Sequence, residues 1–151
     1  MNKFTLALIA GLGTSLAIGL LSYFDATLTN TALLMAPFGA TAVLVFGVYD
    51  SPLAQPKNVI LGHLITSFIG VFFFQFIDVT PMSLAIATGL GVSVMLFTKT
   101  THPPAGANPI LIMLSGQSWG FLVTPVLIGA VTIVLVGKMM QKVKHQFDSK
   151  S

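Results

Sequence analysis

Residues 121–140 read FLVTPVLIGAVTIVLVGKMM, a run in which Lys138 is the only charged residue. A helix needs about 20 predominantly apolar residues to cross the hydrocarbon core of a bilayer, so this stretch is long enough to span it. The whole chain has the same character, because hydrophobic residues make up 54% of its 151 residues and charged residues only 7%. A water-soluble protein needs more charged side chains on its surface than this, and a disordered protein has a far more polar composition. The lack of cysteine excludes a disulfide-stabilised protein. We therefore expect an all-α integral membrane protein with a single transmembrane domain over residues 1–151.

Six apolar segments are predicted to cross the membrane. They run approximately Phe4–Phe24, Ala32–Tyr49, Asn58–Ile77, Met82–Thr98, Pro104–Gln117 and Phe121–Met140. With six crossings, all seven lysines fall on one side, which the positive-inside rule identifies as the cytoplasm. We predict a protein of the bacterial inner membrane with both termini in the cytoplasm. The lysines concentrate toward a basic cytoplasmic tail at residues 142–151, which indicates contact with the bilayer surface and no nucleic-acid partner.

The sequence also contains an internal repeat. Two pairs of stretches correspond in order: LALIAGLGTS at Leu6–Ser15 with LAIATGLGVS at Leu84–Ser93, and PFGATAVL at Pro37–Leu44 with PAGANPIL at Pro104–Leu111. Each half holds an odd number of spans, so the halves enter from opposite sides, as in the inverted-topology repeats of transporters. We therefore predict a 3+3 inverted repeat, with repeat 1 at about 4–77 and repeat 2 at about 82–141. The alternative is that glycine, alanine and leucine recur by chance in apolar sequence.

Small residues recur every four positions on the first and fourth segments. The two stripes are Ala7, Gly11, Ser15 and Gly19, and Ala85, Gly89 and Ser93. Such stripes allow helices to approach closely, either within the chain or in a dimer. A chain of this size is a thin scaffold by itself, so we expect a homo-oligomer, either a dimer or a trimer. A non-transporting scaffold or assembly subunit that packs through the stripes is one hypothesis for the function.

The second and fifth segments are predicted to be short, broken helices. Pro37 and Pro104 suit the first turn of a helix, and the apolar stretches that follow reach only about 20 Å across a hydrocarbon core about 30 Å thick. In an inverted repeat, the two helix N-termini would face each other near the midplane. The unpaired N–H groups and positive dipole ends of these two helix N-termini predict a site for a small inorganic anion. Gly39 and Gly106 have no side chain, so the anion could approach the backbone closely.

The predicted substrate site comprises the residues at these two helix starts. They are Pro37, Phe38, Gly39, Ala40, Thr41, His102, Pro103, Pro104, Ala105, Gly106, Ala107 and Asn108. Thr41 and Asn108, at matching places in the two halves, can add side-chain hydrogen bonds, and His102 can add a donor, a charge or a response to pH. The alternative is that proline and glycine here only permit helix breaks and tight packing.

A second group of polar residues lies at the start of the third segment. Gln55, Lys57, Asn58 and His63 are predicted to form the mouth or pathway on the cytoplasmic side. Lys57 would attract anions there, or it would only anchor the helix at the headgroups. His63 lies deeper in the span, where an imidazole needs a partner.

The absence of certain residue types narrows the function. No Asp or Glu lies inside the six segments, and cation transporters commonly place carboxylates there. The chain has no Cys nucleophile and no His/Glu pair at metal-ligand spacing, so we expect no enzyme, no metal site and no cofactor. These features favour a transporter or channel for a small anion, with the lipid bilayer and that anion as partners.

The motifs around the broken segments resemble those of a known family. Thr101–Ala107, which reads THPPAGA, is similar to the signature of the HPP family of integral membrane proteins. Ala36–Ala40 (APFGA) and Ser51–Asn58 (SPLAQPKN), followed by Gly62-His63, are similar to its first-half motifs. The family is usually described with four transmembrane helices, and the two short segments would account for the difference from six. Some members in plastids and cyanobacteria are linked to nitrite transport, so the resemblance implies that the anion is nitrite or nitrate.

Overall fold

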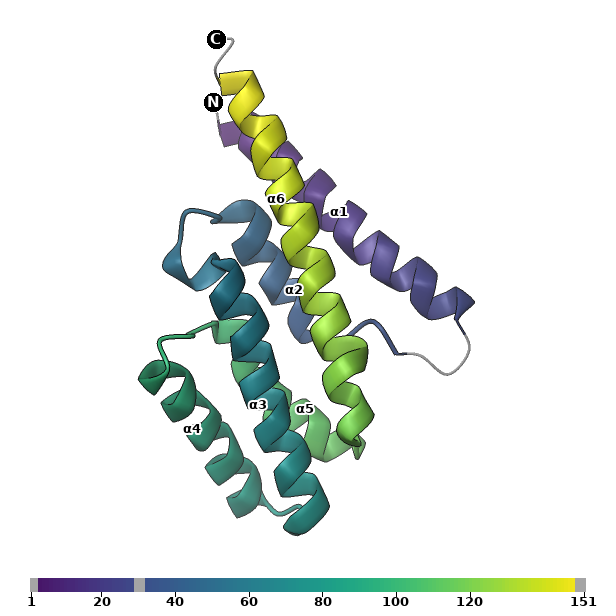
Figure 1. Ribbon diagram of the computed structural model, residues 1–151, viewed down its shortest axis with the longest axis vertical. Coiled ribbons are helices and arrows are strands. Elements are labelled where there is room, and N and C mark those ends of the chain that lie inside the picture. The colour runs from purple at the N-terminus through teal and green to yellow at the C-terminus, as the bar shows by residue number, and fades with distance from the viewer. Residues whose placement is uncertain (1–2, 29–31, 149–151) are drawn as a thin grey trace.

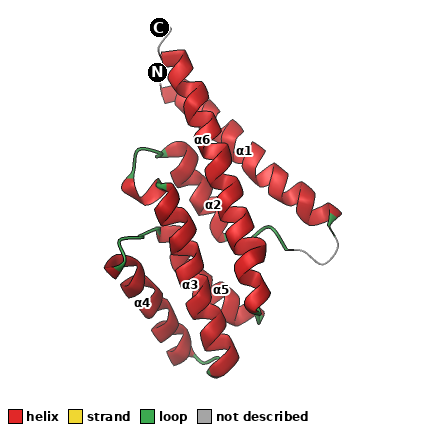
Figure 2. Ribbon diagram, in the orientation of Figure 1, coloured by secondary structure: helices red, strands yellow, loops and turns green. Residues whose placement is uncertain are grey.

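The computed structural model describes residues 3–28 and 32–148, with side chains as far as Lys142, and it is helical throughout (Figures 1 and 2). The chain is 83% helical, and the described residues contain six α-helices and no strand. Short 3₁₀- and π-helical segments, labelled η, join or extend the helices. The predicted all-α class is therefore confirmed.

Three helical stretches are long and apolar enough to cross a membrane: Lys3–Thr27, Pro56–Phe76 and Trp119–Lys142. The first two are α1 and α3. The third consists of the segments η4 (Trp119–Leu122) and η5 (Val123–Leu127) and most of α6 (Ile128–Asp148). Helix α4 (Pro81–Phe97) is shorter, and a capping box between Thr80 and Ser83 fixes its start. The backbone of residues 142–148, predicted as a tail, continues α6.

The two segments predicted to be broken are short in the structure. Helix α2 (Pro37–Ala42) continues into the π-helical segment η1 (Val43–Gly47), and together they are about 17 Å long. The 3₁₀-helical segment η3 (Pro103–Ala107) leads into α5 (Asn108–Ser115), and this pair is about 20 Å long. Helix α5 ends at Gly116, whose φ of 67° lies in the left-handed region that favours glycine.

Helix α3 lies at the centre of the molecule. It packs against α4, α5, α6 and η3, while α1 packs mainly on α6 and η1. The segment η2 (Pro52–Ala54) covers the start of α3. Figure 1 shows α2 running toward the end of the molecule that carries both termini, while α5 runs toward the opposite end. The two broken segments therefore run in opposite directions.

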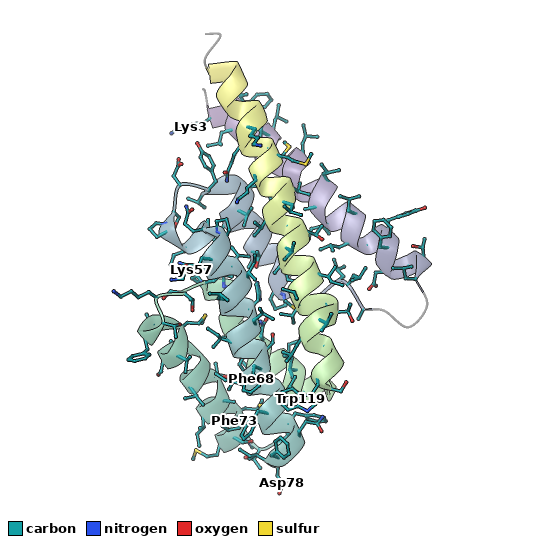
Figure 3. The ribbon with its side chains drawn as sticks, viewed as in Figure 1. Lys3, Lys57, Phe68, Phe73, Asp78 and Trp119 are labelled. Carbon is teal, nitrogen blue, oxygen red and sulfur yellow. The ribbon has the colours of Figure 1, made fainter. Side chains whose placement is uncertain are left out.

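The ends of the helices agree with an even number of crossings. Figure 3 places Lys3 beside the termini and Asp78, which follows α3, at the other end of the molecule. Trp119 also lies toward the Asp78 end, where its ring is 5.5 Å from that of Phe68. The start of α1 and the end of α6 thus lie at the same end of the molecule (Figure 1).

The core between α2, α3, α5 and α6 is apolar. Its fully buried members include Phe38, Val59, Ile112 and Ile133. On α1, only Gly13, Ala17 and Leu21 are buried, so most of its surface is available to lipid. The small-residue stripes face outward, because a Cβ added at Gly11, Gly19 or Gly89 would meet no atom within 4 Å.

Candidate functional site

Six buried polar side chains gather where the two broken segments meet α3. They are Thr41, His63, Thr66, Ser67, His102 and Asn108, each with an exposed fraction of 0%, and we call them the buried polar cluster. Thr41 comes from α2; His63, Thr66 and Ser67 come from α3; His102 precedes η3, and Asn108 begins α5. Both halves of the chain therefore contribute to one polar centre in an otherwise apolar core.

Thr41 links the two histidines of the cluster. Its Oγ1 lies 2.8 Å from His63 Nε2 and 3.0 Å from His102 Nε2. The two imidazole rings stand 5.0 Å apart, edge to face. On its far side, His102 Nδ1 lies 2.8 Å from the carbonyl oxygen of Leu53 in η2. His102 is thus held through both ring nitrogens, which fixes its orientation.

Asn108 closes the other side of the cluster. Its Nδ2 lies 2.9 Å from His63 Nδ1, 3.0 Å from Ser67 Oγ and 3.1 Å from Thr66 Oγ1. The same amide nitrogen lies 3.2 Å from the carbonyl oxygen of His63. Its Oδ1 is buried without a hydrogen-bond partner. A buried acceptor left unpaired costs about 1–3 kcal/mol, so this atom marks a place where a donor would be stabilised.

Close packing around the cluster sets these distances. A Cβ at Gly62 would lie 2.9 Å from His102 Cβ and 3.0 Å from the carbonyl oxygen of Thr100. Only glycine therefore lets the segment before η3 approach α3 so closely. On the other side, the ring of Phe38 stands edge to face against His63, with ring centroids 5.4 Å apart.

The structure divides the residues predicted to bind substrate into two groups. Thr41, His102 and Asn108 lie in the cluster, together with His63, which is predicted to belong to the mouth or pathway. Pro37, Phe38, Pro104 and Ala105 are buried around them. Gly39, Ala40, Pro103 and Ala107 are exposed and Gly106 is half-buried, so these residues lie toward the outer surface of the broken segments.

The prediction that backbone N–H groups are unpaired at the two helix starts is wrong for three residues: Phe38, Gly39 and Ala105. The N–H groups of Phe38 and Gly39 donate to the carbonyl oxygens of Met35 and Ala36. At the other start, the N–H of Ala105 donates to the carbonyl oxygen of His102. At the first start, Ala36 already has helical φ and ψ angles, so the turn before Pro37 supplies the acceptors. At the second start, His102 is extended, and the first turn of η3 bonds back to its carbonyl oxygen. The polar groups available for a guest are therefore side chains.

A cavity of about 330 Å³ lies between η1, the loop that leads to α3, and α6, and none of its lining residues belongs to the cluster. Polar and charged residues line part of it: Tyr49, Asp50, Gln55, Lys138 and Gln141. Gln55 is among the residues that line this cavity, and its assignment to the mouth or pathway stays a prediction. Lys57 is exposed and extends outward (Figure 3). The Nδ2 of Asn58 donates to the carbonyl oxygens of Pro52 and Thr101, so Asn58 joins the two loops.

Sequence reasoning missed several members of the site. Thr66 and Ser67 follow His63 by three and four residues, so helical periodicity places them on the same face of α3. That spacing was available as a signal. The carbonyl oxygen of Leu53 and the cavity residue Lys138 carried no such signal, because their roles depend on how distant segments pack.

Two other kinds of site can be judged from the described residues. His63 and His102 form a pair of imidazoles, but no group of three His, Cys, Asp or Glu side chains gathers to hold a metal ion within the described part of the chain. Residues 116–120 read GQSWG, which has the letters of a serine nucleophile motif. Ser118 is exposed in a turn between two helices, whereas that motif requires a strand-to-helix turn.

Comparison with known proteins identifies relatives of the chain. The family model of the HPP transmembrane region matches residues 1–148. Two curated transmembrane proteins of Dictyostelium discoideum are 38% and 34% identical to the chain in alignments 128 residues long that cover 80% of it. The matches cover 41% and 45% of those two relatives, so the chain spans less than half of their length. No solved structure matches the chain.

Proposed function

We propose that this chain, which belongs to the HPP family of transmembrane proteins, carries a small inorganic anion, nitrite or nitrate, across the membrane as a transporter or channel. Membership of the family and the long apolar helices make it an integral membrane protein. The family resemblance suggests the identity of the anion. The two curated relatives are named only as transmembrane proteins, so the transported species is our proposal.

The observation that carries the proposal is the buried polar cluster. Polar side chains inside a membrane protein are costly, and they commonly mark a substrate or ion pathway. Here two broken segments and the central helix α3 all direct polar groups to one point. Hydroxyl groups, an amide and two imidazoles can exchange hydrogen bonds with a small oxyanion. No carboxylate belongs to the cluster, which favours an anion over a cation.

Two glycines support the inverted repeat that we propose for the architecture. Gly129 follows Gly62 by 67 residues, the offset that relates Pro37–Leu44 to Pro104–Leu111. A Cβ at Gly62 would meet His102, in the second half, at 2.9 Å. A Cβ at Gly129 would meet the ring of Phe38, in the first half, at 2.1 Å. Each glycine thus admits the broken segment of the opposite half, as an exchange between inverted repeats would require.

We also propose that the protein is a homo-oligomer, a dimer or a trimer. The 3₁₀ helix η3 follows irregular backbone at Thr100–His102, and Pro103 and Ala107 are exposed at its two ends. Irregular backbone at membrane depth is tolerated where protein or water covers it, not where lipid does. Gly39 and Ala40 of α2 are exposed as well. A second copy of the chain packed on these residues would shield them. The bacterial inner membrane and the cytoplasmic position of both termini stay predictions.

A scaffold without transport is the second candidate function. It is favoured by the outward-facing stripes, on which Gly11, Gly19 and Gly89 leave open space around them. Flux measurements distinguish the two candidates. Purified protein in vesicles of phosphatidylcholine and phosphatidylglycerol should move nitrite faster than protein-free vesicles do, and should not move potassium. Flux of potassium alone would overturn the anion proposal, and absence of any flux would favour the scaffold.

A further inference from the structure

Four hydrogen-bond contacts join five groups into one line across the core. In order they are Asn108 Nδ2 to His63 Nδ1 at 2.9 Å, His63 Nε2 to Thr41 Oγ1 at 2.8 Å, Thr41 Oγ1 to His102 Nε2 at 3.0 Å, and His102 Nδ1 to Leu53 O at 2.8 Å. All four distances lie within the normal range for hydrogen bonds. The line contains an imidazole, a hydroxyl and a second imidazole in succession, and each of these groups can both donate and accept a proton.

The Leu53 end of the line fixes the tautomer of His102. The carbonyl oxygen of Leu53 can only accept, so His102 carries its hydrogen on Nδ1. In the neutral ring, Nε2 is then an acceptor and receives the hydroxyl hydrogen of Thr41. The carbonyl oxygen of Pro37, 3.1 Å from the same hydroxyl, offers that hydrogen a second acceptor. The Thr41 hydroxyl can therefore turn between two acceptors.

The Asn108 end fixes the tautomer of His63. The amide group of Asn108 faces the carbonyl oxygen of His63 and the hydroxyl of Thr66, whose own hydrogen goes to the carbonyl oxygen of Gly62 at 2.8 Å. Both neighbours accept, so the amide presents its NH₂ group to them and to His63 Nδ1. His63 then carries its hydrogen on Nε2 and donates it to Thr41. Every donor in the line consequently points from Asn108 toward Leu53.

The two ends of the line differ in their surroundings. Leu53 immediately precedes Ala54, which lines the polar cavity of about 330 Å³. At the other end, Asn108 is followed by Pro109, and Pro109 and Ile112 pack closely against Gly70 in an apolar contact. The unpartnered Oδ1 of Asn108 lies at this inner end. The line thus leads from a buried acceptor to the wall of a polar cavity.

Charged groups lie outside the line. Helices α2, α4 and α5 and the segments η2 and η3 carry no charged or titratable side chain. Asp50 and Lys138 line the cavity, and Lys57 is exposed at the start of α3. Lys99 follows α4 and is exposed. Of the titratable groups described here, His63 and His102 are therefore the pair that can carry a proton through the cluster.

We propose that this line is a proton relay and that the transported species is an anion together with a proton, that is, the conjugate acid of a weak-acid anion such as nitrite. The inference rests on the proposed transport function. The hydroxyl of the acid donates to Asn108 Oδ1, the acceptor that has no partner within the protein. A bare anion must compete with acceptors inside the cluster for its donors, whereas the hydroxyl of the acid meets an acceptor that is free. A strong-acid anion such as nitrate is not protonated in water, so it brings no proton to the relay.

The proton balance of the relay is complete. When the amide nitrogen of Asn108 leaves His63 Nδ1, the hydroxyl of the acid moves from Asn108 Oδ1 to that nitrogen. Its O–H bond then breaks and the proton binds His63 Nδ1, which leaves the anion. The hydrogen on His63 Nε2 passes to Thr41, and the Thr41 hydroxyl hydrogen passes to His102 Nε2. The hydrogen on His102 Nδ1 is released when its contact with the carbonyl oxygen of Leu53 opens, and it passes to water on the side of the cavity. One proton enters and one leaves, and the reverse sequence delivers a proton from the cavity to the anion. Asn108 can release His63 Nδ1 because Thr66 and Ser67 also accept its hydrogens.

Nitrite uptake and proton movement, measured together in vesicles that contain a pH-sensitive dye, test the relay. The wild type should move protons with nitrite and should move none with nitrate. Thr41→Val keeps the shape of the side chain but removes the linking hydroxyl, so nitrite-driven proton movement should fall to the level of protein-free vesicles. Thr41→Ser should restore it. Thr88→Val is the matched control, because the Thr88 hydroxyl bonds only within its own helix, to Leu84 O.

The outcomes separate the relay from the proposed function. Absence of nitrite flux in the wild type would overturn both. Nitrite flux without protons, or proton movement that persists in Thr41→Val, would overturn the relay alone. Should Thr41→Val fail to fold, ¹⁵N NMR of the histidines in the wild type decides independently. The relay requires hydrogen on Nδ1 of His102 and on Nε2 of His63, and the opposite tautomer at either ring would overturn it.

Discussion

Replacing Gly62 with alanine tests whether the approach of two segments sets the geometry of the buried polar cluster. A Cβ at this position would lie 2.9 Å from His102 Cβ. Carbon atoms in contact lie about 3.5–4.0 Å apart, so His102 must move by about 0.6 Å. Its hydrogen bond to Thr41 is 3.0 Å long, and a displacement of this size is enough to take it beyond about 3.5 Å, where it ceases to be a hydrogen bond. The substitution should therefore open the link between the two histidines.

The effect of Gly62→Ala on stability should be smaller than its effect on function. Crowding in a packed core costs about 1–3 kcal/mol, while alanine in place of glycine stabilises a helix by about 1 kcal/mol. The net loss of unfolding free energy is then about 0–2 kcal/mol, so the variant should fold.

Thermal unfolding in detergent and nitrite flux in vesicles measure the two effects of this substitution. Gly89→Ala is the matched control, because a Cβ there meets no atom within 4 Å, and it should keep wild-type flux and equal or higher stability. A folded Gly62→Ala protein with wild-type nitrite flux would refute the reasoning.

Two further substitutions test the face that the broken segments expose. Gly106→Leu should change the unfolding temperature little, because a Cβ at Gly106 meets no atom within 4 Å, and it should leave nitrite flux close to that of the wild type, because Gly106 lies toward the outer surface and outside the buried polar cluster; loss of flux in a folded variant would show that the anion passes along this outer face. Ala107→Cys should form cross-linked dimers when oxidised in membranes, because Ala107 is exposed at the end of η3 and the chain has no native cysteine. Gel electrophoresis without reducing agent detects the dimer, and Ser118→Cys, in an exposed turn outside the broken segments, is the control. Exclusively monomeric Ala107→Cys protein would contradict the interface.

The apolar segments and their breaks could be predicted because their causes are local. Hydropathy alone marks a span, and Pro37 and Pro104 end any continuous helix that runs through them. Thr41 and Asn108 could be placed near one another because they hold matching positions in the two halves. The prediction succeeded at this level because it used only the order of the segments and the fixed geometry of a helix.

The position of His63 could not be predicted in the same way. It lies in the cluster because Gly62 lets the segment before η3 pack directly on α3, and this contact joins residues about 40 positions apart. The free amide donors were wrongly predicted for a different reason. Ala36 has helical φ and ψ angles, so the turn before Pro37 already supplies acceptors for the first N–H groups. Such a turn depends on a backbone conformation that composition does not specify.

The central claim is that the buried polar cluster receives the transported species. The most direct measurement is ¹⁵N NMR of histidine-labelled protein in bilayers during titration with nitrite, with His145→Gln used so that His63 and His102 give the histidine signals. We predict that both resonances shift and reach saturation as nitrite is added, and that Asn108→Leu abolishes the shift. Resonances that stay unchanged while the same preparation transports nitrite would contradict the claim, because the anion would then cross the protein elsewhere.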